Sequence, residues 1–174
     1  MMNNNRIAIV CAALFLAMSP ARAQVSKTLS FDFSNPAVMS LDINRNAVSF
    51  KLPPNFSAEP KDMADAVTIV VKSNVPWVLT AVVTADFRAI ESAGNTIPSE
   101  RMEYRCRIRT PVAGASCQES YQPLVKNQSL EVAKGGSTPN EGVAIATDYQ
   151  LKLTLQDPAG TYTLPITYTL NPVQ

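Results

Sequence analysis

The stretch TYTLPITYTL, residues 161–170, decides the expected fold of this chain. Large apolar side chains alternate in it with threonines, and Pro165 is the only interruption. A period of two residues, rich in β-branched and aromatic side chains, is typical of a β-strand with one buried face. Because proline cannot donate a hydrogen bond to a ladder, Pro165 places this strand at a sheet edge or at a bulge. The predicted buried face is Tyr162, Leu164, Ile166, Tyr168 and Leu170.

Similar patterns recur along the rest of the chain and predict an all-β fold. Residues 66–72 and 77–84 are β-branched and apolar runs, and residues 102–109 and 151–156 alternate apolar with polar side chains. Helical patterning is confined to residues 58–66, which could form one turn, and residues 134–142 (KGGSTPNEG) form a polar loop. We expect a single antiparallel immunoglobulin-like β-sandwich over residues 24–174. Further alternating strand candidates lie near the N-terminus: Leu29, Phe31 and Phe33, then Val48 and Phe50.

The N-terminus predicts export. A short segment with Arg6 precedes twelve consecutive apolar residues, 7–18, which Ser19-Pro20 ends; Ala21-Arg22-Ala23 offers the small residues of a cleavage site. The apolar run is shorter than the ~20 residues that span a bilayer. We therefore expect residues 1–23 to be a cleaved signal peptide and the product, with no transmembrane anchor, to reside in the periplasm or at the cell surface.

Composition argues against several functions. Without Arg6 and Arg22, 13 basic residues face 14 acidic ones, a net charge of −1 that favours neither nucleic acid nor an anionic membrane. The chain has no histidine, which removes Ser-His-Asp and Cys-His catalysis and most zinc and copper sites. Asp62 and Asp65 form only a weak calcium candidate. We expect no enzyme, no metal and no cofactor, with a carboxylate-only glycan hydrolase as the remaining catalytic alternative.

Two cysteines remain after the predicted cleavage, because Cys11 lies in the export signal. In an exported protein the isolated pair Cys106 and Cys117 is most simply a disulfide. Two free thiols are the alternative. A bridge over a loop of about a dozen residues is worth on the order of 3 kcal/mol in the chain-entropy model.

The strand at residues 102–109 carries positive charge on its outer face. Arg105, Arg107 and Arg109 alternate there, and Arg101 precedes them. A solvated face that discourages pairing of sheet edges is one interpretation. Binding of an acidic glycan or wall polymer is the other.

Trp77-Val78-Leu79 follows Pro76 and begins a strand, so Trp77 is expected in the core, with a sugar-binding surface aromatic as the alternative. This triplet, together with the strand that carries Tyr162, Ile166, Tyr168 and Leu170, resembles the paired signatures of WxL-type bacterial surface domains. Tyr168 stands where that family has a second tryptophan. The resemblance implies an exported β-rich domain that associates with cell-wall glycan or with other surface proteins.

The same terminal strand, after Gly160, is also similar to the last strand of chaperone-assembled fimbrial subunits, with Val173 where those subunits carry a penultimate tyrosine. This resemblance implies β-augmentation and self-assembly, with a donated strand formed by Val25, Leu29, Phe31 and Phe33. We expect an exported, non-catalytic structural or interaction module of the cell envelope with a self-contained sandwich. A fimbrial subunit assembled by strand donation is the alternative.

Overall fold

The computed structural model describes residues 29–50, 59–92, 94–110 and 112–173. The predicted signal peptide, its cleavage site and Val25 lie outside the described residues. The chain divides into two units, Met1–Ser34 and Asn35–Gln174. All strands of the described residues belong to the second unit, and the predicted all-β antiparallel sandwich is confirmed.

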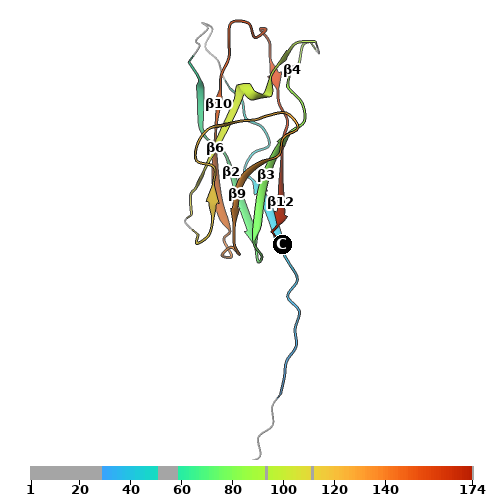
Figure 1. Cartoon of the computed structure of the whole chain (residues 1–174), viewed down its shortest axis with the longest axis vertical. Helices are drawn as coiled ribbons and strands as arrows, with labels where there is room; N and C mark the ends of the chain where they lie inside the picture. The colour runs from blue at the N-terminus through green and yellow to red at the C-terminus, as the bar shows by residue number, and fades with distance from the viewer. Residues whose placement is uncertain (1–28, 51–58, 93, 111, 174) are drawn as a thin grey trace, which may run out of the picture. The chain divides into compact units, whose positions relative to one another are not determined.

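The larger sheet of the sandwich has β2, β10 and β6 at its centre, and each neighbouring pair is antiparallel (Figure 1). The second large sheet is also antiparallel. In spatial order the first sheet is β1 (Met39–Ile43), β2 (Lys61–Ser73), β10 (Val143–Leu151), β6 (Met102–Ile108) and β8 (Gln122–Pro123). The second is β12 (Ile166–Pro172), β3 (Trp77–Val83), β9 (Leu130–Gly135) and β7 (Ser116–Cys117).

A small third sheet and one short turn of 3-10 helix complete the described elements. The sheet has the order β11 (Tyr162–Thr163), β4 (Phe87–Ala89) and β5 (Thr96–Ile97), and the turn, η1, spans Ser99–Arg101.

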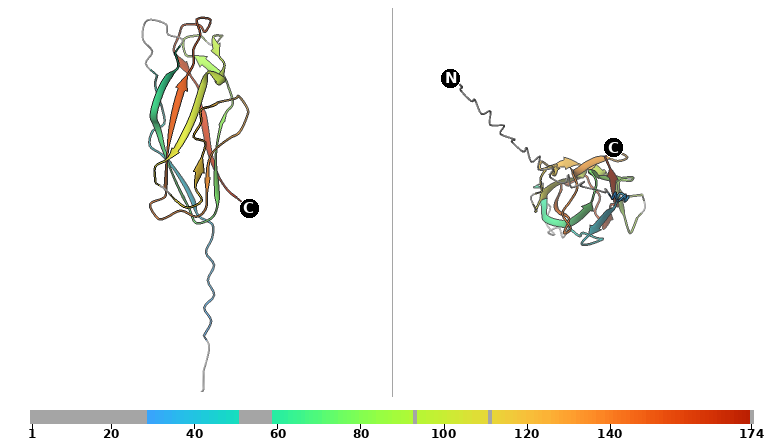
Figure 2. Two further views of the ribbon diagram at one scale, coloured as in Figure 1. Left: turned by 60° about the vertical axis from the view of Figure 1, so that its left-hand side comes forward. Right: turned by 90° about the horizontal axis from the view of Figure 1, so that it is seen from below.

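One apolar core lies between the two large sheets, and Figure 2 shows the strands surrounding it. Trp77 and Leu79 on β3 are fully buried, as the strand period predicts for alternate residues. The core position of Trp77 is thereby confirmed. A Cβ atom built on Gly135, the register partner of Trp77, would lie 2.8 Å from Trp77 Cζ2, so the indole fits only beside a residue without a side chain.

Several local predictions are wrong. Residues 61–66 belong to the long strand β2 instead of a helical turn, because strand pairing with β10 overrides weak helical patterning. Residues 161–170 do not form one strand: β11 and β12 belong to different sheets, and the chain leaves the ladder at Leu164 and Pro165. Leu29, Phe31 and Phe33 lie outside any strand and are 75%, 82% and 89% exposed. Val48 and Phe50 also lie outside any strand, and of residues 151–156 only Leu151 is in a strand, as the last residue of β10.

Candidate functional site

The last strand, β12, lies at the edge of its sheet, as predicted, although Pro165 lies just before this strand and not within it. Within the described residues it pairs only with β3. The inward side chains Ile166, Tyr168 and Leu170 pack against the core but are only half-buried, whereas every inward side chain of β3 is buried. An edge strand that retains free backbone groups and incompletely buried apolar side chains is a template for another strand.

The first strand, β1, forms the corresponding edge of the five-stranded sheet and contacts β12. It is only five residues long beside the thirteen of β2. Met39 and Leu41 on β1 are half-buried against the core, and Ile43 is 41% exposed. We call the β1 and β12 edges together, with Met39, Leu41, Ile166, Tyr168 and Leu170, the open edge.

The strand order shows which neighbour β12 would have in a complete immunoglobulin sandwich. That fold has strands A, B, E and D in one sheet and C, F and G in the other. Here β1, β2, β10 and β6 match A, B, E and D, while β3 and β12 match C and F, in both chain order and spatial order. The described residues contain no strand in the place of G, which would lie against the outer side of β12.

Tyr168 of the open edge is tied to the opposite sheet. Its hydroxyl forms a hydrogen bond with the hydroxyl of Tyr149 on β10. Burial raises the pKa of both phenols, so both remain protonated across the physiological pH range. Tyr168 therefore joins the two sheets.

The predicted arginine face is a network of ion pairs around a buried carboxylate. Asp148 is fully buried at a bulge in β10. Its Oδ2 accepts a hydrogen bond of 2.9 Å from Arg105 Nε, and its Oδ1 accepts one of 3.0 Å from Arg107. Burial raises the pKa of Asp148, but hydrogen bonds from the Asp65 backbone N–H and from these two arginines outweigh burial and leave the pKa below its usual value.

The remaining arginines of this face are paired as well. Asp65, which adopts a left-handed backbone with φ of 50°, binds Arg107 at 2.9 Å and Arg109 at 2.8 Å. Arg101 lies apart from this cluster and pairs with Asp157 at 3.6 Å. The guanidinium of Arg105 also stacks 4.6 Å from the centre of the Tyr121 ring. Two carboxylates thus neutralise most of the charge of three arginines, which leaves little attraction for an anionic polymer.

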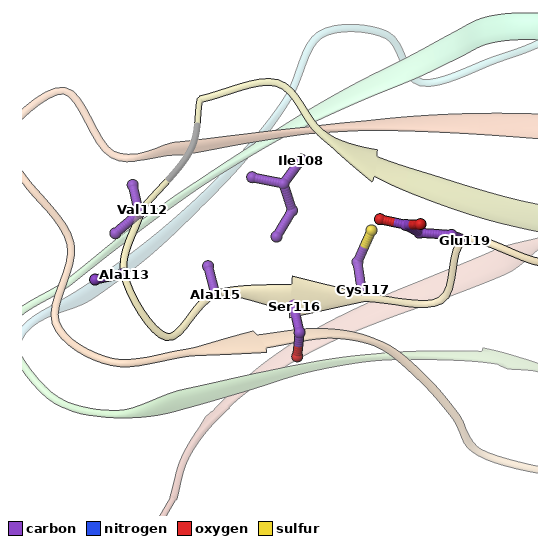
Figure 3. A pocket seen from close by; sticks show the side chains of 7 residues that line it. All are labelled: Ile108, Val112, Ala113, Ala115, Ser116, Cys117 and Glu119. Atoms are coloured by element: carbon purple, nitrogen blue, oxygen red, sulfur yellow. The ribbon is translucent and has the colours of Figure 1, made fainter.

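The two cysteines lie on facing strands of different sheets, Cys106 on β6 and Cys117 on β7. Both are free thiols in this structure, and they interact directly with each other. Cys106 is fully buried, whereas Cys117 is half-buried and lines a shallow surface pocket of about 500 Å³ (Figure 3). The Cys106–Cys117 disulfide remains a prediction, and the direct interaction between the two thiols agrees with it.

Other kinds of site find little support in the described part of the chain. No group of three or more His, Cys, Asp or Glu side chains is placed there to hold a metal ion. Asp62 accepts hydrogen bonds from the Gln150 amide and the Tyr121 hydroxyl. Among the described residues, no helix has the length and apolar character needed to cross a bilayer.

The sequence had indicated the open edge through Pro165 and the alternation of β12, but it gave no sign of Met39 and Leu41 as its other border. Asp148 was also missed; the only signal is a single acidic residue in the run VAIATDYQL, residues 143–151.

No protein-family model matches this chain, and a search of curated proteins found no match to it.

Proposed function

We propose that this protein is an exported, non-catalytic structural subunit of the cell envelope that joins to copies of itself by strand donation. The acceptor is the open edge, and the donor is the segment of residues 24–34 from a second copy. The observation that carries the proposal is the state of β12. This strand corresponds to F, the sixth of the seven strands of an immunoglobulin sandwich, and its inward side chains are only half-buried because the described residues contain no seventh strand beside it. The periplasm or the cell surface is its proposed location.

The donor segment has the pattern that such an edge requires. Leu29, Phe31 and Phe33 share one face of an extended chain, with Ser30 and Asp32 on the other. These three apolar side chains are more than 70% exposed and belong to the separate unit Met1–Ser34. At ~3.3 Å per residue, a strand of about seven residues would match the length of β12. Main-chain hydrogen bonds would supply affinity, and alternate side chains would supply specificity.

Glycan binding through Trp77 is an alternative envelope function with less support than strand donation. The indole is fully buried against Gly135, so it offers no face to a sugar ring. A Trp77→Ala variant should therefore change glycan binding only through lost folding. Retention of the melting temperature together with loss of wall binding would favour the WxL-like function.

The oligomeric state of the protein without its signal, residues 24–174, tests strand donation. We expect size-exclusion chromatography with light scattering to show a ladder of species, and we expect a Phe31→Asp variant to collapse it to monomer. Ser30→Asp is the matched control, since it adds the same charge on the opposite face of the segment and should preserve the ladder. A monomeric intact protein, or equal loss of the ladder in both variants, would refute strand donation between copies.

A free peptide of residues 24–34 provides the complementary test. Added to the monomeric Phe31→Asp protein at about 100 times its dissociation constant, it should stabilise the fold by about 2.7 kcal/mol. That corresponds to a rise in melting temperature of roughly 5–10 °C for a domain of this size. The same peptide carrying Phe31→Asp should have no effect, and an equal rise with both peptides would contradict recognition of the apolar face.

A further inference from the structure

The pocket beside β7 gives the two cysteines different chemical roles. It is lined mainly by small and apolar side chains of β6, of the following turn and of β7, and Figure 3 shows Cys117 beside the carboxylate of Glu119. The lining residues are Ile108, Val112, Ala113, Ala115, Ser116, Cys117 and Glu119. Cys106 is not among them: it is fully buried, and its sulfur lies 3.2 Å and 3.0 Å from the carbonyl oxygens of Gln118 and Val132.

We propose that this pocket is a thiol–disulfide exchange site at which Cys117 is the entry sulfur and Cys106 the resolving sulfur. The co-reactant is a reactive disulfide, carried by an oxidoreductase protein or by a small molecule such as oxidised glutathione. A reagent in solvent reaches Cys117 through the pocket, whereas it reaches Cys106 only if the sandwich opens. The apolar walls formed by Val112 and Ala115 suit a segment of chain that carries the disulfide.

The reaction proceeds in two balanced exchanges. The Cys117 thiolate attacks one sulfur of the reagent disulfide, forms a mixed disulfide, and expels the other half of the reagent as a thiolate. Cys106 then loses its proton and attacks the Cys117 sulfur; the Cys106–Cys117 bond forms and the mixed disulfide breaks. Two electrons pass from the protein to the reagent, and the two protons end on the two released thiols or in solvent. Reduction by a dithiol is the reverse sequence and begins with attack on Cys117.

The local electrostatics agree with this order. A hydrogen bond from Cys106 lowers the pKa of the Cys117 thiol, against opposing effects of burial and of the Glu119 carboxylate. The pKa of Cys106 is raised by its interaction with Cys117 and by burial. Since the thiolate is the nucleophile, Cys117 is the sulfur that ionises first.

The test uses reduced, folded protein of residues 24–174 and oxidised glutathione near neutral pH, with the mixed disulfide followed by intact mass and located by peptide mapping. In Cys106→Ala we expect a stable mixed disulfide at Cys117. In Cys117→Ala we expect modification of Cys106 to be at least about 100-fold slower, since a buried thiol must wait for local opening. In denaturant, the modification rate of Cys117 in Cys106→Ala and that of Cys106 in Cys117→Ala should agree within about twofold.

Glu119→Gln separates the role of the pocket from simple exposure. Removing this negative charge should lower the pKa of Cys117 further and raise its modification rate by about two- to fivefold. Glu141→Gln, at an exposed position outside the pocket, is the control and should leave the rate unchanged. In the wild type the mixed disulfide should map to Cys117 before the internal bridge appears. Mapping to Cys106, similar rates for the two single variants, or an unreactive Cys117 in the folded protein would overturn the proposal.

Discussion

Strands β10 and β12 come from the same half of the chain and meet through the hydroxyls of Tyr149 and Tyr168, yet they differ in burial and in the number of neighbouring strands. β10 lies between β2 and β6, and seven of its nine residues are buried. β12 has one partner in the described structure and no fully buried residue. The interior strand is specified by contacts within this molecule, whereas the edge strand retains unused capacity for pairing. We attribute stability to the first and assembly to the second.

The largest effect expected within β10 comes from Asp148→Ala. The substitution leaves Arg105, Arg107 and the Asp65 backbone N–H without their shared acceptor. We expect a loss of about 2–4 kcal/mol in the free energy of unfolding, less than for a fully buried network because both arginines reach solvent. Denaturant unfolding at neutral pH measures this loss. Glu131→Ala, which breaks an exposed ion pair with Lys134 on β9, should cost no more than about 0.5 kcal/mol.

The same carboxylate predicts the pH dependence of stability. The folded-state pKa of Asp148 is depressed below the ordinary pKa of an aspartate, because burial, which raises it, is outweighed by hydrogen bonds from the Asp65 backbone N–H and from Arg107 and Arg105. Its contribution is therefore fully present above the unfolded-state pKa and is lost as pH falls through the folded-state pKa. We expect the denaturation midpoint to fall more steeply below about pH 4 in the wild type than in Asp148→Ala. Parallel curves for the two proteins would contradict this assignment.

A smaller effect is expected where β9 meets the tryptophan of β3. Gly135→Ala places a Cβ atom 2.8 Å from Trp77 Cζ2 and should destabilise the fold by about 1–3 kcal/mol. Gly136→Ala is a close control, because its Cβ would meet nothing within 4 Å. In a Trp77→Leu background the cost of Gly135→Ala should largely disappear. Equal cost in both backgrounds would show that the indole is not the constraint.

The difference in burial between β10 and β12 also explains how well each strand could be predicted from the sequence. β12 shows clean alternation because one of its faces meets solvent, so its existence and its edge position could be read from the sequence. β10 shows no alternation, because both of its faces are buried and Asp148 interrupts the apolar run. This strand was therefore not predicted. Local patterns also favoured Leu29, Phe31 and Phe33 as a strand of this domain, although they lie outside any strand here.

The candidate sites show the same limit. The sequence placed Arg105, Arg107 and Arg109 on one strand face, but it could not reveal that Asp65 and Asp148 neutralise them, since Asp65 is 42 residues from Arg107 and Asp148 is 41. Pairing between Cys106 and Cys117 was inferred from the compartment and the cysteine count. The difference in exposure between the two sulfurs required the structure.

The smallest expected effect lies at the contact between the two strands. Tyr168→Phe removes the hydrogen bond with Tyr149 and should cost about 1 kcal/mol, because the Tyr149 hydroxyl is left in a buried setting. Tyr162→Phe removes an exposed hydrogen bond to Pro158, where water can substitute, and should cost less than about 0.5 kcal/mol. Thermal unfolding of both variants measures the difference. Equal effects would show that the cross-sheet bond adds nothing to stability.

Hydrogen exchange of β12 amides tests the central claim most directly, in assembled protein of residues 24–174 and in its Phe31→Asp variant. The account predicts that amides of β10 are protected in both proteins. Amides of β12 that do not pair with β3 should be protected in the assembled wild type and exchange rapidly in Phe31→Asp. Ser30→Asp should retain the wild-type pattern. If β12 exchanges equally in the wild type and in Phe31→Asp, or if protection appears at β7 or β8 instead, the open edge does not accept the donated strand.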